Sequence, residues 1–405
     1  MGNAPEKQSR SSLRQMSDVR RPTAPTTTLA PPPLSLYIHV PWCVRKCPYC
    51  DFNSHEGSKE LPEAAYIAAL LEDLSHDLHL AQDRTIESVF IGGGTPSLFS
   101  GEAYQRLFDA LRKQLRFSPN CEITLEANPG TVEQERFKGY RAAGINRLSI
   151  GVQSFQNSQL EKLGRIHNSA NAVAALHTAR DAGFGRINID LMHGLPGQSA
   201  SDAVSDIKTA LKLGVSHLSW YQLTIEPNTH FHKAPPELPS EETLAEIQTQ
   251  GLAAIAAAGL SPYEVSAYAV PGEESRHNLN YWRFGDYLAL GAGAHGKITL
   301  GNDILRYQKT RLPDHYLQRP GSRTAQQHQV LREDRAFEFA MNTLRLHEGF
   351  SPAQFESRTD LPFSDILPIV HGLFEDGLVV ERGEHFACSE TGRRYLDDVV
   401  ARFLP

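Results

Sequence analysis

The sequence predicts an α/β protein: an incomplete barrel of six β/α units, then an α+β segment and a small C-terminal winged-helix-like helical domain. Three observations lead to this fold class. Short apolar, β-branched runs alternate with longer amphipathic runs from Leu34 to about residue 260. Aromatic and glycine-rich runs then replace this pattern. From about residue 325, short helical patterns surround a hairpin-like run at 376–392.

The barrel prediction rests on strand patterns with helical patterns between them. The strands are expected, in chain order, at 34–40, 88–93, 122–128, 147–154, 187–194 and 217–224. The helices are expected around 62–80, 101–116, 131–143, 170–182, 201–213 and 241–258. Such alternation favours a parallel sheet with right-handed crossovers, so the helices cover the outside. Six units rather than eight predict a barrel that does not close.

Composition divides the chain into four segments. Residues 1–33 are rich in Pro, Ser and Thr and are predicted to be disordered, because they hold too few apolar side chains to form a core. An organelle transit peptide is the alternative for this segment, and Glu6, Asp18 and the proline tract argue against it. The other expected segments are a barrel at 34–260, an α+β extension at 261–324 and a small helical domain at 325–405.

The overall composition is that of an ordinary globular protein. The 405 residues are 40% hydrophobic and 21% charged, with a formal net charge of -7, so phosphate-driven binding of nucleic acid is not expected. This weakens the DNA-binding interpretation of a winged C-terminal domain and favours packing or partner docking. No apolar run is long enough to cross a bilayer. Five cysteines do not form a disulfide framework, which favours a reducing compartment and a cytoplasmic location.

Three of the five cysteines lie close together after the first predicted strand. Cys43, Cys47 and Cys50 have the spacing Cys-x3-Cys-x2-Cys, which lets a short loop curl around one inorganic centre. A 4Fe-4S cluster normally takes four cysteines, so three would leave one iron open to an external ligand. A zinc site is one alternative, and it would need His39 or His55 as a fourth ligand.

Buried thiols without a metal are the other alternative for these cysteines. That interpretation does not explain why Arg45 and Lys46 lie between the first two of them. Cationic neighbours favour the thiolate form and would offset the negative charge of a sulfide cluster. Cys121 and Cys388 stand alone in the sequence and are expected to be ordinary buried thiols.

Polar or glycine-rich residues follow several of the other predicted strands. Glycines at 92–94 and Thr95 follow the second strand. The glycines lack side chains and would let a ligand approach the backbone, and Thr95 adds a hydroxyl. A tight strand-to-helix turn would explain the same glycines. Glu126, Gln153 and Asp190 close the next three strands. The C-terminal rim of a parallel barrel is where sites are built, although hydrogen bonds that close a strand end are the alternative role.

The cysteine spacing, with Tyr49 before the third cysteine, resembles the cluster motif of the radical S-adenosylmethionine superfamily. That resemblance implies a 4Fe-4S cluster on Cys43, Cys47 and Cys50. It also implies that S-adenosylmethionine chelates the open iron and is cleaved to a 5′-deoxyadenosyl radical by the reduced cluster. The cofactor contacts that the resemblance implies are Tyr37, Tyr49, Gly93, Gly94, Thr95, Glu126, Gln153, Arg165 and Asp190.

Within that superfamily, motifs along most of the chain resemble the haem chaperones of the HemW family. These motifs include "IGGGTPSL", "RLSIGVQSF", "IDLMHGLPGQ" and "HNLNYWRFGDYLALGAGAHG". The family is related to oxygen-independent coproporphyrinogen III oxidase, from which this chain departs twice. Phe52 stands where the oxidase has a fourth cysteine, and the oxidase lacks the "HNxxYW" element at 277–282.

The "HNxxYW" element is the predicted haem site. An imidazole at His277 suits haem iron, Tyr281 and Trp282 offer flat apolar faces, and Asn278 can orient the ligand. Ordinary core packing is the alternative for a lone histidine with aromatic neighbours. His295 is a second candidate, and its flanking glycines indicate a structural turn instead.

Three hypotheses for the function follow. The first is a haem chaperone with a cluster and S-adenosylmethionine. Its partners would be haem as cargo, acceptor haemoproteins such as respiratory cytochromes, and an electron donor, with at most peripheral membrane contact. The second is the enzyme that oxidatively decarboxylates coproporphyrinogen III. The third, a nucleic-acid binder with an accessory cluster, is disfavoured by the charge of the chain.

Overall fold

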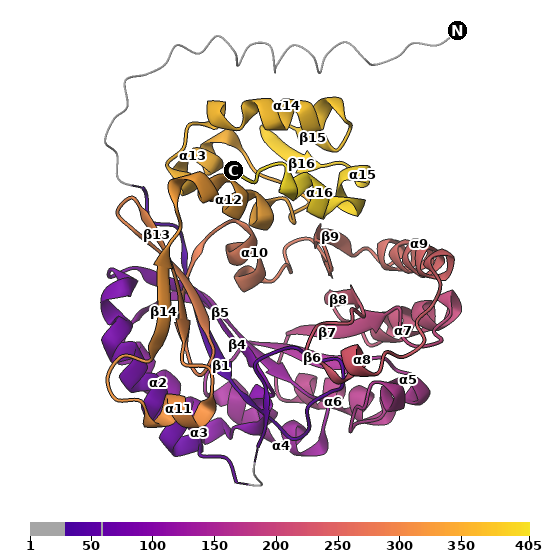
Figure 1. The fold of residues 1–405 in the computed structure, drawn as a ribbon. Coiled ribbons are helices and arrows are strands. Elements are labelled where there is room, and N and C mark those ends of the chain that lie inside the picture. Colours follow the sequence, from indigo (N-terminus) through magenta and orange to yellow (C-terminus); the bar gives the residue numbers. More distant parts are fainter. Residues whose placement is uncertain (1–28, 58–59) are drawn as a thin grey trace.

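The computed structural model describes residues 29–57 and 60–405. The predicted disorder of residues 1–33 therefore falls mostly outside the described residues. The described residues form a 12-stranded sheet in the order β14-β13-β12-β11-β1-β4-β5-β6-β7-β8-β10-β9, curved into an open barrel (Figure 1). The fold class that the sequence predicts is confirmed.

The parallel part of the sheet contains the six predicted strands in chain order. They are β1 (Leu34–Val40), β4 (Thr85–Gly93), β5 (Arg116–Ala127), β6 (Arg147–Gln153), β7 (Arg186–His193) and β8 (His217–Gln222). Neighbours in this series pair in parallel. Only β5 differs clearly, because it begins at Arg116 instead of residue 122. The run "RFSPN" is too polar to show strand periodicity, so Cys121 lies inside this strand and not before it.

Helices connect these strands and cover the outer face of the barrel (Figure 1). The six predicted helices are α2 (Glu63–Asp77), α3 (Gly101–Gln114), α4 (Thr131–Ala142), α6 (Ser169–Asp181), α7 (Ala200–Lys212) and α9 (Glu241–Ala257). Side chains of Ser100, Asn168, Ser199 and Ser240 cap four of their N-termini, which fixes where each helix begins. The last residues of the helix predicted around 62–80 form the separate η1 (Leu78–Ala81). The short η2 (Pro96–Leu98), α5 (Asn157–Lys162) and α8 (His230–Lys233) were not predicted.

The segment at 261–324 adds strands to both edges of the parallel sheet. Next to β8 lie β10 (Ala267–Ala269) and then β9 (Ser261–Glu264), both antiparallel. At the other edge β11 (Asp286–Leu290) pairs in parallel with β1, and β12 (His295–Leu300), β13 (Asp303–Lys309) and β14 (Thr324–Gln329) follow antiparallel. The segment also contains α10 (Arg276–Trp282) and α11 (Pro313–Gln318). Domain boundaries at 260 and 324 stay a prediction.

The C-terminal residues form a small helical unit with a hairpin. Its elements are η3 (Arg332–Asp334), α12 (Arg335–Thr343), α13 (Pro352–Thr359), η4 (Phe363–Asp365), α14 (Leu367–Glu375), β15 (Val379–Arg382), β16 (His385–Cys388), α15 (Glu390–Arg394) and α16 (Leu396–Ala401). Its own aromatic core also takes in Phe284 and Ile304 from the sheet side. Phe284 precedes β11, so this unit packs near the end of the sheet where the parallel strands β1 and β11 begin (Figure 1).

Candidate functional site

The cysteine loop, residues 41–57, leaves the C-terminal end of β1 and carries three half-buried, unpaired thiols. Each sulfur has a hydrogen-bonding neighbour. Thr95 Oγ1 lies 3.5 Å from Cys43 Sγ, and Arg165 Nη1 lies 3.4 Å from Cys47 Sγ. Ser54 Oγ lies 3.6 Å from Cys50 Sγ. Such contacts stabilise sulfur that carries negative charge, as it does when it ligates a metal.

Burial acts against the thiolate at two of these cysteines. It raises the pKa of Cys43, although the hydrogen bond from Thr95 partly offsets this effect. It also raises the pKa of Cys50, although Ser54 and the charge of Lys46 act in the opposite direction. The cationic neighbours expected from the sequence therefore do not outweigh desolvation, and a metal would have to displace the thiol protons.

A cavity of about 510 Å³ opens beside the cysteine loop and is lined by residues of the parallel strands and of α10. The three cysteines line it, together with most of the predicted cofactor contacts. Those that line it are Tyr49, Gly93, Gly94, Thr95, Glu126, Gln153, Arg165 and Asp190. Of the predicted haem residues, Asn278 and Trp282 line the same cavity. A volume of this size is typical of a small-molecule site.

Three predicted residues do not line the cavity. Tyr37 lies on β1, and its hydroxyl contacts His39 Nδ1 at 2.8 Å. His277 is buried and stacks on Phe90 with ring centroids 4.2 Å apart. Tyr281 packs edge to face against the ring of Tyr287, with centroids 4.7 Å apart. These three residues are part of the packing around the cavity and not of its wall.

The glycines after β4 are required by contacts within the protein itself. A Cβ on Gly94 would lie 2.5 Å from the carbonyl oxygen of Trp42, so the cysteine loop could not pack as closely. Gly93 has a φ of +120°, and a Cβ there would lie 2.7 Å from the His39 ring. The glycine run thus brings the cysteine loop against the end of β4. The tight connection is therefore present, and approach of a ligand to these glycines stays a prediction.

Two buried carboxyl groups, Glu126 and Asp190, line the cavity. Burial and the nearby Asp190 together raise the pKa of Glu126 to about 8, although the hydrogen bond from the Gly93 N–H acts in the opposite direction. Burial also raises the pKa of Asp190, which accepts hydrogen bonds from Ser149 at 3.0 Å and Asn188 at 2.7 Å. A positively charged ligand in the cavity would lower both pKa values, because it favours the ionised carboxylates.

Arg165 and Gln153 are held by neighbours that the sequence analysis missed. Arg165 Nη2 donates to Asn128 Oδ1 at 2.7 Å and to Gly151 O at 2.8 Å. Gln153 has a φ of 69°, unusual for a residue other than glycine, and its Oε1 accepts from Tyr221 at 2.7 Å. Asn128 and Tyr221 also line the cavity. Asn128 could have been found, because it lies two residues after Glu126 in the run "LEAN".

The environment of His277 is that of a buried, neutral histidine. Its Nδ1 lies 3.0 Å from Ser275 Oγ and 3.6 Å from Glu122 Oε1. Burial lowers the pKa of His277, and Glu122 partly offsets this effect. Haem ligation by His277 stays a prediction, and it would require α10 to rearrange. The second candidate, His295, is exposed at the start of β12.

The donor set fits a cluster and its external ligand. A cubane takes its thiolates at different iron corners, so its cysteines need not converge on one point. The described residues contain no group of three His, Cys, Asp or Glu side chains that could hold one metal ion. Glu126 and Asp190 offer carboxylates for an amino group or hydroxyls, and Arg165 offers a cation for a carboxylate. S-adenosylmethionine carries all of these groups.

Among the described residues, no helix combines the length and the apolarity needed to cross a lipid bilayer.

Comparisons with known proteins agree along most of the chain. Residues 37–210 match the Radical SAM superfamily, and residues 330–395 match the HemN C-terminal domain. The Heme chaperone HemW of Haemophilus influenzae is 49% identical, over 92% of this chain and 98% of that protein. The same figures hold for the Heme chaperone HemW of Escherichia coli. The Heme chaperone HemW of Bacillus subtilis is 34% identical, over 91% of this chain and 99% of that protein.

Among solved structures, coproporphyrinogen III oxidase (HemN) from Escherichia coli has a similar fold. The TM-score is 0.78, the identity is 24%, and the match covers 92% of this chain and 90% of that one. At this level of identity the likeness shows the fold alone.

Proposed function

Because this chain belongs to the HemW family within the radical SAM superfamily, we propose that it is a haem chaperone that holds a 4Fe-4S cluster and S-adenosylmethionine. The observation that carries the proposal is the shared cavity. The three unpaired cysteines and two residues of the "HNxxYW" element, Asn278 and Trp282, line one space. The heme chaperones HemW of Haemophilus influenzae, Escherichia coli and Bacillus subtilis support the role of haem as cargo.

In this proposal Cys43, Cys47 and Cys50 would hold three irons of the cluster, and S-adenosylmethionine would be the ligand of the fourth iron. When bound, the cluster would supply electrons that cleave S-adenosylmethionine, or it would be the site where S-adenosylmethionine binds as a regulator. The chain's own residues bind and orient the cofactor. Gly93, Gly94 and Thr95 would face its methionyl end, and Arg165 lies beside Cys47. Tyr49, Glu126, Gln153 and Asp190 form the rest of the proposed contact set.

Trp282 links the cavity to the C-terminal unit and supports haem binding near α10. The Arg345 guanidinium lies 4.5 Å from the centroid of the indole ring. The buried indole N–H has no hydrogen-bond partner among the described residues, so a ligand acceptor would satisfy it. Asn278 Nδ2 donates to Tyr263 at 3.1 Å and is held in place. In this proposal, haem lies against Trp282 and Tyr281, with His277 as its axial ligand.

The partners that we propose follow from the same role. The chaperone would receive haem in the cytoplasm and pass it to acceptor haemoproteins such as respiratory cytochromes, at most in peripheral contact with a membrane. A reduced carrier would supply electrons to the cluster. Nucleic acid is not a proposed partner, because the net charge of -7 gives no basis for binding phosphates.

The test is anaerobic reconstitution of the cluster, followed by iron counting and haem titration on one preparation. We expect about four irons per chain and a shift of the Soret band that saturates with haem. The absence of any Soret shift in the wild type would refute the haem role. Formation of protoporphyrinogen from coproporphyrinogen III and S-adenosylmethionine would instead establish the oxidase, which is the alternative function.

The axial ligand is tested separately with two histidine variants. His277→Ala should alter the haem spectrum, and His295→Ala should leave it unchanged. The reverse result would move the ligand to His295, which is the exposed candidate. Because His277 is buried against Glu122, the melting temperature of each variant must be measured to separate ligation from folding.

A further inference from the structure

We propose that Asn53 is a positioning residue that fastens the cysteine loop, and so the proposed cluster, to a glycine turn at residues 291–293. The inference rests on the proposed cluster and adds a residue to its support. Asn53 lies three residues after Cys50 in the run "CDFNS". It is far from the glycine turn in the sequence. The turn directly follows β11, which pairs with β1.

The side chain of Asn53 uses its full donor capacity on two backbone carbonyls. Its Nδ2 donates to Ala292 O at 2.9 Å and to Arg311 O at 2.9 Å. Its Oδ1 accepts from Arg311 Nε at 3.3 Å. An amide has two N–H donors, and here both hold chain segments far away in the sequence. Asn53 therefore acts as a clamp between the cysteine loop and the sheet edge.

The backbone of Asn53 is fixed as well. His39 Nε2 lies 2.9 Å from Asn53 O, and a carbonyl can only accept, so this nitrogen carries the proton. His39 Nδ1 then accepts from the Tyr37 hydroxyl at 2.8 Å. Burial lowers the pKa of His39 to about 4, which keeps the ring neutral and this arrangement intact at neutral pH. Tyr37 thus supports the cysteine loop from β1 without lining the cavity.

The glycines of the turn are required for this close approach. A Cβ on Gly293 would lie 2.2 Å from Asn53 Nδ2, and its φ is +81°. A Cβ on Gly291 would lie 2.3 Å from the carbonyl oxygen of His39, and its φ is +104°. Side chains at either position would push the cysteine loop away. The run "GAGAHG" thus has a specific role, as the surface on which the loop rests.

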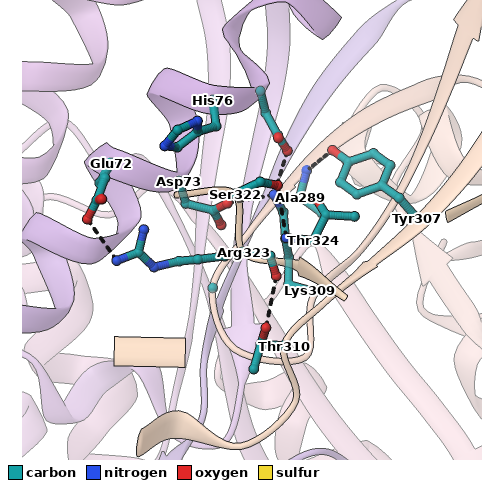
Figure 2. Close-up of polar contacts among 12 residues, drawn as sticks. Glu72, Asp73, His76, Ala289, Tyr307, Lys309, Thr310, Ser322, Arg323 and Thr324 are labelled. Carbon is teal, nitrogen blue, oxygen red and sulfur yellow. Dashed lines mark hydrogen bonds and ion pairs between the residues drawn. The ribbon is translucent and has the colours of Figure 1, made fainter. Parts of the chain in front are cut away.

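The turn is itself held by a buried ion network, shown in part in Figure 2. Gly291 N donates to Tyr316 OH at 3.1 Å, and that hydroxyl donates to Asp73 Oδ2 at 2.7 Å. Lys309, which is fully buried, donates to Asp73 at 2.6 Å and to Asp77 at 2.5 Å. Gly293 N donates to the carbonyl of Thr310, the residue after Lys309. The clamp therefore ends on a segment that buried hydrogen bonds and ion pairs hold in place.

The test compares Asn53→Ala and Asn53→Asp with the control Asn146→Ala. Asn146 makes the same kind of bonds, to Ile123 N and Cys121 O at 2.8 Å, far from the cysteine loop. After anaerobic reconstitution, iron release to a chelator and the electron paramagnetic resonance of the reduced cluster, with and without S-adenosylmethionine, are measured. Melting of the iron-free proteins reports on stability alone.

We expect both Asn53 variants to release iron at least about tenfold faster than the wild type, the factor that corresponds to about 1.4 kcal/mol. Asn146→Ala should lower the melting temperature without changing iron release. Asn53→Asp keeps the size and the Arg311 contact but replaces the two donors with oxygen. Wild-type iron release in Asn53→Asp would therefore overturn the clamp.

Gly293→Ala approaches the same contact from the other side. It should speed iron release as Asn53→Ala does. Gly259→Ala is the matched control, because Gly259 also has a φ of +81° and a Cβ there meets nothing within 4 Å. Equal iron release from both glycine variants would contradict the proposal. A wild-type protein that takes up no iron would refute the cluster itself, which is a different result from either of these.

Discussion

Burial and hydrogen bonding act in opposite directions on the thiols of Cys43 and Cys50. Burial raises both pKa values, and the hydroxyls of Thr95 and Ser54 partly offset it. The cost of burial is largest for a thiolate alone and is removed when a metal shares the charge. Cys121 and Cys388 lie elsewhere, where burial raises their pKa values to about 12 and about 11.

The first prediction separates these two kinds of cysteine. Replacing Cys43, Cys47 or Cys50 with Ala should abolish stable iron binding, because three thiolates are the minimum for the proposed cluster. Cys121→Ala and Cys388→Ala should retain wild-type iron content after anaerobic reconstitution. They should cost only packing energy, because both thiols are buried. Iron lost from either control would mean that the cluster has another ligand.

The second prediction concerns the pH dependence set by Glu126. Its pKa is raised from 4.5 to about 8, so the folded state holds a proton that the unfolded chain releases. This group stabilises the fold fully below about pH 4.5, and its contribution falls as the pH rises toward 8. Glu126→Gln should therefore make the iron-free protein more stable at pH 8, by roughly 1–3 kcal/mol.

At pH 5 the difference in unfolding free energy between Glu126→Gln and the wild type should be small. Denaturant unfolding at both pH values measures it, with Glu246→Gln on the exposed face of α9 as a control. A Glu126→Gln variant with the same relative stability at pH 5 and pH 8 would show that water in the cavity cancels the shift.

At the scale of elements, helix α9 illustrates how closely a helix covers the parallel sheet. Gly251 on α9 faces Trp220 on β8, and a Cβ at Gly251 would lie 2.2 Å from the indole ring. The chain between these two elements also returns to the cysteine loop, where Phe231 N donates to Pro48 O at 2.9 Å. The segment between β8 and α9 thus contacts the cysteine loop, and the two elements at its ends pack against each other.

The third prediction tests that packing with two helical glycines. Gly251→Ala should destabilise the protein by about 1–3 kcal/mol, because the added methyl overpacks the contact with Trp220. Gly372→Ala on α14 should stabilise it by about 0.5–1 kcal/mol, because a Cβ there meets nothing within 4 Å and Ala favours the helix. Chemical denaturation of both variants measures the effects. If Gly251→Ala and Gly372→Ala changed the stability in the same direction, the contact with Trp220 would not be tight.

At the scale of the whole molecule, the edge strands β11–β14 support the site from outside the six β/α units. They carry the glycine turn that receives the cysteine loop, and they are held to α2 by Lys309, Asp73 and Asp77 (Figure 2). Arg323 adds a partly exposed ion pair to Glu72 at 2.8 Å. The C-terminal unit closes the other end of the sheet through Phe284.

The fourth prediction concerns this buried network. Lys309→Met should destabilise the protein by about 3–5 kcal/mol, because it leaves two buried carboxylates without a cation. The loss should grow from pH 5 to pH 8, since burial already raises the pKa of Asp73 and the missing lysine would raise it further. Arg394→Met, which breaks an exposed ion pair, should cost less than about 0.5 kcal/mol. Unfolding curves at both pH values measure these effects.

Recovery in a second variant completes this test. Adding Asp73→Asn and Asp77→Asn to Lys309→Met should restore part of the lost stability, because neutral amides are cheaper to bury than carboxylates. If the triple variant were less stable than Lys309→Met, hydrogen bonding and not charge would dominate the network.

The sequence by itself determined the six parallel strands, their helices and the cysteine loop. Apolar periodicity and local spacing carry this information, because strands buried on both faces are continuous apolar runs and ligands on one loop are close in sequence. The haem chaperone family was also recognisable from motifs. The tertiary structure alone decided which residues meet. Asn53 and the glycine turn at 291–293 are far apart in the chain, and no periodicity links them.

The same reason explains why the sequence did not show the burial and the partners of His277, Tyr37 and the carboxyl groups of the cavity. A side chain's burial and partners depend on strands that pair across long sequence separations, as β11 does with β1. The motif at 277–282 was visible in the sequence, but only the fold places His277 against Phe90 and leaves Asn278 and Trp282 at the cavity. Local pattern thus specifies the elements, and non-local packing specifies the site.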